Sequence, residues 1–146
     1  MAREAAAANV TADLSGRAVD VAWNIESIDA PDDSFYGLIC IHLLEHVDAR
    51  RALSEMRRIL TPGGAALVMV PLYEGLDQSY RNPEAAAGPD RDRWLHFHQH
   101  DHVQLLGRAV RDLLSATGFE VGEFVATGSA AAKHGLVPGE RVFVLR

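Results

Sequence analysis

The stretch DDSFYGLICIHLLEHVDARRALSEMRRILTPGGAALVMVP, residues 32–71, contains two apolar runs separated by an amphipathic segment. The runs at 36–42 and 65–72 are short, rich in apolar residues and bounded by turn residues, which predicts two strands. Between them apolar residues recur at helical spacing, with Asp48 as N-cap and the turn that begins at Pro62 as the end of the helix. A strand, a helical crossover and a second strand favour a parallel pair.

Further strand-like and helix-like segments flank this unit. Four more strands are predicted at residues 8–14, 18–22, 120–126 and 141–145. A second helix is predicted from about Val103 to Thr117, because leucine and valine recur along one stripe and Gly118 follows it. The alternation indicates an α/β fold, with a mainly parallel sheet and helices on its faces. Ligands of such sheets bind at the C-terminal ends of the strands.

Composition limits the class of function. The chain has 146 residues, 48% hydrophobic and 23% charged, which is typical of one globular domain. Its net charge of −6 argues against a nucleic-acid partner. No apolar run approaches the ~20 residues of a membrane helix, and the first residues show no signal-peptide pattern, so we expect a cytoplasmic protein without a membrane partner. The single cysteine, Cys40, lies in an apolar run, which predicts a buried, unreactive thiol.

One long stretch is predicted to be a loop. It runs from Tyr73 to about Asp92 and contains Pro83, Gly88 and Pro89, which interrupt regular structure. A loop of this length in a small domain usually covers a site or binds a ligand.

The 32–71 stretch resembles the part of class I S-adenosylmethionine (SAM)-dependent methyltransferases, of the small-molecule, type-11-like kind, that runs from the fourth strand to the fifth. DHVQLLGRAVRDLLSATGFEV (101–121) and KHGLVPGERVFVLR (133–146) resemble the last helix and the closing hairpin of that family. The resemblance covers nearly the whole chain. It implies one Rossmann-like domain over residues 1–146, with an antiparallel C-terminal hairpin and a small-molecule substrate.

The Gly-rich loop of that family, G-x-G-x-G, has no counterpart in this sequence, so the chain resembles a truncated domain without the first strand. The resemblance implies that Asp13 binds the ribose hydroxyls of SAM and that Asn24 lies near the adenine. Half a site forgoes many of the contacts that offset the entropic cost of binding, so we expect weak SAM binding by this chain alone. A missing central strand would leave sheet edges unpaired, which favours a homodimer or a complex with another chain.

The segment RWLHFHQHDHVQLLG, residues 93–107, has histidine at every second position from 96 to 102. In an extended segment the four side chains would share one face. His102 is usual in the family, whereas His96, His98 and His100 are additional. Such a cluster favours a divalent transition metal such as Zn²⁺, Fe²⁺ or Cu²⁺. The alternative is a solvated loop of neutral imidazoles.

A second histidine motif, HLLEH, follows the strand at 36–42. H-x-x-E-H is a zinc pattern on a continuous helix, although methyltransferases without a metal often carry the same run. Both histidine segments follow the C-terminal ends of neighbouring strands, so we expect them to lie at the same ligand-binding crevice. The predicted site therefore comprises the further metal ligands His42 and His46 and the catalytic residues Glu45, Asp101 and Tyr36.

Three functions remain open from the sequence. The first is a methyltransferase-derived enzyme that has lost self-sufficient SAM binding and acts on a small molecule through a histidine-bound metal. The second is a SAM-dependent small-molecule methyltransferase whose Gly-rich part comes from a partner chain or lies outside this sequence. The third is a non-catalytic subunit that regulates an active homologue through exposed sheet edges.

Overall fold

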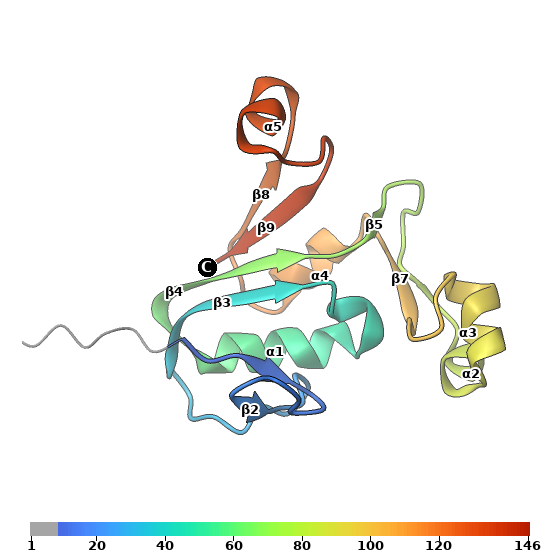
Figure 1. The fold of residues 1–146 in the computed structure, drawn as a ribbon, viewed down its shortest axis with the longest axis horizontal. Coiled ribbons are helices and arrows are strands. Elements are labelled where there is room, and N and C mark those ends of the chain that lie inside the picture. The colour runs from blue at the N-terminus through green and yellow to red at the C-terminus, as the bar shows by residue number, and fades with distance from the viewer. Residues whose placement is uncertain (1–8) are drawn as a thin grey trace, which may run out of the picture.

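The largest sheet of the computed structural model, which describes residues 9–146, has four strands in the order β3-β4-β9-β8 (Figure 1). These are β3 (Phe35–Ile41), β4 (Leu60–Met69), β9 (Arg141–Leu145) and β8 (Val121–Val125). β3 and β4 are parallel, whereas β9 runs antiparallel to both β4 and β8. The α/β fold and the antiparallel C-terminal pair are confirmed, but this sheet is mixed rather than mainly parallel.

Two smaller sheets accompany it. One is the parallel pair β1 (Ala12–Asp13) and β2 (Val21–Ala22); the other, in the order β5-β7-β6, consists of β5 (Leu72–Tyr73), β7 (Gln104–Gly107) and β6 (Tyr80–Arg81). The strands predicted at 8–14 and 18–22 are therefore only two residues long each. Within residues 9–146 neither pairs with β3, so the larger sheet ends at β3.

Helix α1 (Ala49–Ile59) forms as its sequence predicts. The Asp48 side chain accepts hydrogen bonds from the backbone N–H groups of Arg50 and Arg51 at 3.0 and 3.3 Å. The helix ends at Ile59, and β4 begins directly at Leu60, five residues earlier than predicted. The Pro-Gly-Gly run thus lies inside an extended segment. A Cβ on Gly64 would lie 2.8 Å from the carbonyl oxygen of Tyr36, which explains why glycine stands there.

The prediction of one continuous loop from Tyr73 to Asp92 is wrong, because this region contains one short helix and the first three residues of another. They are α2 (Pro83–Ala87) and α3 (Asp90–Phe97). Asn82 caps α2 by accepting a hydrogen bond from the N–H of Ala85 at 3.0 Å, and Pro89 immediately precedes α3. Proline at or just before the first helical position starts a helix rather than breaking one.

The helix predicted from Val103 to Thr117 is also only partly correct. Its first part is the strand β7, whose four residues are all buried, and the helix α4 covers Val110–Ala116. Periodicity cannot separate a short buried strand from a helical turn. A further helix, α5 (Gly128–His134), lies between β8 and β9. In Figure 1, α2 and α3 lie beyond the C-terminal ends of β3 and β4, and α5 lies at the far end of β8 and β9.

The main core packs α1 and α4 against β3, β4, β7 and β9. Its members with exposure of 2% or less include Leu44, Leu53, Met56, Val68, Leu106, Leu114 and Phe143. Cys40 is 6% exposed in the same core, so the predicted burial is confirmed. Within residues 9–146 no helix has the length and apolar character needed to cross a membrane.

Candidate functional site

A groove of about 1250 Å³ lies between β3 and the β1–β2 pair. β3 contributes all seven of its residues to the lining, and Met56 and Ile59 of α1 also line it. Three β3 side chains are strongly exposed: Tyr36, Ile39 and Ile41 are 77%, 73% and 53% exposed. In the described part of the chain no strand pairs with this edge of β3. The groove is therefore largely apolar, and a row of unpaired backbone groups borders it.

Both predicted cofactor residues line this groove. Asp13 ends β1, and Asn24 follows β2 by two residues. Hydrogen bonds from Ser15, from its hydroxyl first and then its backbone N–H, hold the pKa of the Asp13 carboxyl below its ordinary value. Asn24 Oδ1 accepts a hydrogen bond from the N–H of Glu26 at 2.9 Å. The family resemblance assigns Asp13 and Asn24 to one ligand site, and in the structure both residues line one groove.

A second group of polar side chains lies beyond the C-terminal end of β3. Glu45 and His46 belong to the short 3-10 helix η1 (Leu44–His46), and His102 precedes β7. Each offers one ligand atom, and these three atoms lie within 4.8 Å of one another. We call Glu45, His46 and His102 the Glu-His cluster. His46 also lines the groove, so the two sites adjoin.

Two contacts join the elements that carry this cluster, although they are more than 50 residues apart in sequence. The N–H of Val103 donates to the carbonyl oxygen of Glu45 at 3.0 Å. The buried side-chain amide of Gln104 donates to the carbonyl oxygens of Leu44 and Val47 at 2.7 and 2.8 Å. Gln104 is a site residue that the sequence motifs did not predict. A polar residue inside an otherwise apolar, buried strand was the available signal.

Two of the three residues of the Glu-His cluster, Glu45 and His102, are buried, and the cluster is incompletely hydrogen-bonded. Glu45 is 1% exposed and His102 is 8% exposed. Among the described residues, Glu45 Oε2 and His102 Nδ1 have no hydrogen-bond partner. Burial, together with the neighbouring His46, lowers the pKa of His102, so this imidazole is neutral near pH 7. The His46 and His102 rings meet edge to face, with centroids 4.7 Å apart.

The other predicted metal ligands lie elsewhere. The expected extended His-rich segment is wrong, because His96 lies in the last turn of helix α3 (Asp90–Phe97), His98 is left-handed and residues 98–101 form bends rather than a strand. His96 Nδ1 lies 2.7 Å from the hydroxyl oxygen of Tyr80. His98 ends the helix with φ of 62°, and the exposed His100 ring stacks on Trp94 at 5.0 Å between centroids.

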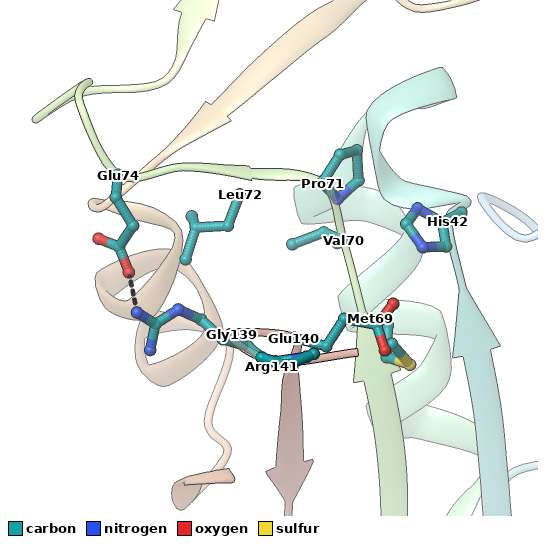
Figure 2. A pocket seen from close by; sticks show the side chains of 10 residues that line it. His42, Met69, Val70, Pro71, Leu72, Glu74, Gly139, Glu140 and Arg141 are labelled. Atoms are coloured by element: carbon teal, nitrogen blue, oxygen red, sulfur yellow. Dashed lines mark ion pairs between the residues drawn. The ribbon is translucent and has the colours of Figure 1, made fainter. Parts of the chain in front are cut away.

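His42 lies beside the cluster. Its Nδ1 is 3.5 Å from Glu45 Oε1, and its side chain is 53% exposed. It also lines a smaller pocket of about 370 Å³ at the end of β4 (Figure 2). There Glu74 forms an ion pair with Arg141 at 2.9 Å. Of the six histidines predicted as ligands, the fold brings His46 and His102 together, with His42 next to them.

The three predicted catalytic residues, Glu45, Asp101 and Tyr36, do not all lie together. Asp101 belongs near the cluster, because its Oδ2 lies 3.6 Å from His46 Nδ1. Tyr36 is the second residue of β3, so about 16 Å of strand separates it from the end where Glu45 lies. Tyr36 lines the groove instead.

A family model described as "Methyltransferase domain" matches residues 1–123. No curated protein matches the chain.

Several solved structures share the fold. A SAM-dependent methyltransferase from Mesorhizobium loti is 18% identical, with a TM-score of 0.54, and the match covers 84% of this chain and 66% of that one. The 1,6-didemethyltoxoflavin-N1-methyltransferase from Burkholderia thailandensis was solved with bound 1,6-didemethyltoxoflavin and S-adenosylhomocysteine. It is 20% identical, with a TM-score of 0.56, and the match covers 86% of this chain and 49% of that one. A chain in the complex of the Haloferax volcanii Trm112 methyltransferase activator with a methyltransferase is 17% identical, with a TM-score of 0.53. That match covers 84% of this chain and 58% of the other. The chain thus spans less than two thirds of these structures.

Proposed function

Because the chain belongs to the methyltransferase domain family, we propose that it takes part in SAM-dependent methyl transfer to a small molecule, with the groove beside β3 as the site of the SAM nucleoside. The observation that carries the proposal is that Asp13, Asn24 and the unpaired edge of β3 line one groove. The Burkholderia structure, which contains S-adenosylhomocysteine and a small-molecule substrate, supports the same class of reaction.

The polar groups of the groove suit a nucleoside. The ionised Asp13 carboxylate is an acceptor, and vicinal ribose hydroxyls are donors to such a group. The amide of Asn24 can donate to a ring nitrogen of adenine. Trp23 and Phe35, which meet edge to face with centroids 6.0 Å apart, add an aromatic wall to the same groove. An apolar cleft with a few polar groups is the usual form of a cofactor site.

The dimensions of the same groove support the expectation that this chain alone binds SAM weakly. Its volume of about 1250 Å³ exceeds the ~300–1000 Å³ typical of a small-molecule pocket. The sequence contains no Gly-rich turn that would approach the methionine part of SAM. A further strand, from a partner chain or from sequence outside these 146 residues, would pair with β3, narrow the groove and complete the site. The methyltransferase–activator complex from Haloferax volcanii is a precedent for a partner chain.

A second candidate function is metal-assisted chemistry on a small molecule in place of methyl transfer. The Glu-His cluster favours it, because methyl transfer from SAM needs no metal at that position. In this version the groove would hold the substrate, and His46 would join the two sites. The two candidates differ in whether SAM occupies the groove.

Titration calorimetry with SAM and with S-adenosylhomocysteine tests the first candidate. We expect weak binding by the parent chain and about 10-fold or greater loss for Asp13→Ala, since a hydrogen bond to a charged group contributes about 1.5–3 kcal/mol. Asp112→Ala changes an exposed carboxylate on α4 outside the groove, and it should bind as the parent does. Binding by neither ligand, or equal binding by the parent and Asp13→Ala, would reject the nucleoside site.

A further inference from the structure

We propose that Glu45, His46 and His102 bind one divalent transition-metal ion. The ligand atoms of the three residues lie within 4.8 Å of one another. In a tetrahedral site with metal–ligand bonds near 2.1 Å, ligand atoms are about 3.4 Å apart. Small side-chain rotations would therefore close the three ligands around one ion without a change of backbone.

Unpaired buried polar atoms point to a missing cation. Glu45 Oε2 and His102 Nδ1 are buried and lack a hydrogen-bond partner among residues 9–146, and the two residues are only 1% and 8% exposed. A buried polar atom without a partner is unfavourable. A metal ion bound by Glu45 and His102 would supply a partner inside this buried group.

The tautomer of His46 supports the same conclusion. Its Nδ1 lies 3.1 Å from the carbonyl oxygen of Asp101, which can only accept, so Nδ1 carries the hydrogen. The lone pair then lies on Nε2, 3.9 Å from Glu45 Oε1. At this separation one metal ion can bind both Nε2 and Oε1. An imidazole that donates its other N–H to a carbonyl is the usual arrangement around a bound metal.

The donor set and the local charge identify the class of metal. Two imidazoles and one carboxylate suit Zn²⁺, Fe²⁺ and similar ions, whereas Mg²⁺ and Ca²⁺ prefer oxygen ligands. The carboxylate of Asp101, 3.6 Å from His46 Nδ1, adds a second negative charge nearby. Three protein ligands leave a position for water or substrate, and His46 borders the groove where that position would be reached.

The site is held rigidly, as a metal site requires. The bond from the N–H of Val103 to the carbonyl of Glu45 ties the His102 segment to η1. The two bonds from Gln104 fix the backbone on either side of Glu45 and His46. The metal site is independent of methyl transfer and is the chemical basis of the second candidate function.

Zinc binding to tag-free, chelator-treated protein tests the proposal. We expect one Zn²⁺ per chain by elemental analysis, and a dissociation constant, measured against a chromophoric chelator, that rises at least 10-fold in His46→Gln and in His102→Gln. The matched control is the double variant His98→Ala, His100→Ala, which removes two exposed histidines nearby and should retain the parent affinity. Zn²⁺ should also raise the melting temperature of the parent but not of the glutamine variants.

Substoichiometric binding by the parent would overturn the proposal. So would equal loss of zinc in the double variant, because it would assign binding to the surface histidines. Far-UV circular dichroism of each variant establishes that it is folded, and Co²⁺ gives a second readout, since ligation by His46 and His102 would produce visible absorption that the glutamine variants lose. Asp13→Ala should bind Zn²⁺ as the parent does, so failure of the SAM proposal and failure of the metal proposal give different results.

Discussion

Replacing Gln104 by leucine should destabilise the protein although the two side chains are similar in size. Gln104 is 2% exposed, and its amide donates to the carbonyl oxygens of Leu44 and Val47 at 2.7 and 2.8 Å. Leucine removes both donors, and a buried polar group left without a partner costs about 1–3 kcal/mol. Leucine recovers some apolar burial. We therefore expect the free energy of unfolding to fall by about 2–4 kcal/mol.

Urea denaturation followed by circular dichroism measures this difference, with zinc removed so that metal linkage does not contribute. The melting temperature should fall by about 4–16 °C, since each kcal/mol shifts it by about 2–4 °C in a chain of this size. The control is Gln78→Leu, because that side chain is exposed. As a positioning residue, Gln104 should also affect zinc affinity, by about 10-fold or more.

A loss in Gln104→Leu within about 0.5 kcal/mol of the control would refute the reasoning, because ordinary surface substitutions fall in that range. Unchanged zinc affinity in a destabilised variant would show that the two hydrogen bonds support the fold but do not position the Glu-His cluster.

Three further predictions concern the core and α1. Leu53→Ala, at a fully buried position, should lower the free energy of unfolding by about 2–5 kcal/mol in urea denaturation, and a loss below 1 kcal/mol would contradict the packing described. Asp48→Ala removes the acceptor for two N–H groups of α1 and should cost about 1 kcal/mol, whereas Asp48→Asn should cost much less. Burial, with a smaller contribution from Glu45, raises the pKa of the Cys40 thiol to about 12, so iodoacetamide at pH 8 should alkylate it only after unfolding. Because the pKa of the Cys40 thiol is higher in the folded protein than its ordinary value of 9.0, the protonated thiol contributes to the free energy of unfolding. This contribution is complete below about pH 9 and is lost as the pH rises toward 12. Rapid alkylation of the folded protein at pH 8 would contradict the prediction.

The unit β3-α1-β4 is the part of the fold that the sequence determines by itself. The N-cap at Asp48, the apolar stripe of α1 and the two flanking apolar runs are local patterns, and each gives the predicted type of element, although β4 begins five residues earlier than its apolar run predicts. The buried thiol of Cys40 follows from the same runs. Local periodicity suffices here, because each element buries the face that its own spacing defines.

The region from residue 73 to residue 107 shows where local patterns fail. Pro83 and Pro89 predict a loop, yet in the structure one helix begins at Pro83 and another directly after Pro89. Alternating histidines predict one shared face, but that face exists only in an extended chain, and the segment runs from the last turn of α3 through a left-handed residue into bends. A proline or a short apolar run permits either conformation, and packing selects one.

The residues of the candidate sites were likewise only partly predictable from the sequence. The sequence named Asp13, Asn24, Glu45, His46 and His102 as site residues, together with others that the fold places elsewhere. It could not say that Glu45 and His102 meet, because they are 57 positions apart and the pairing of β7 with β5 and the Gln104 amide bring them together. Residue type and local spacing determine what chemistry a chain can offer, whereas only long-range packing decides which of those groups lie within bonding distance of one another.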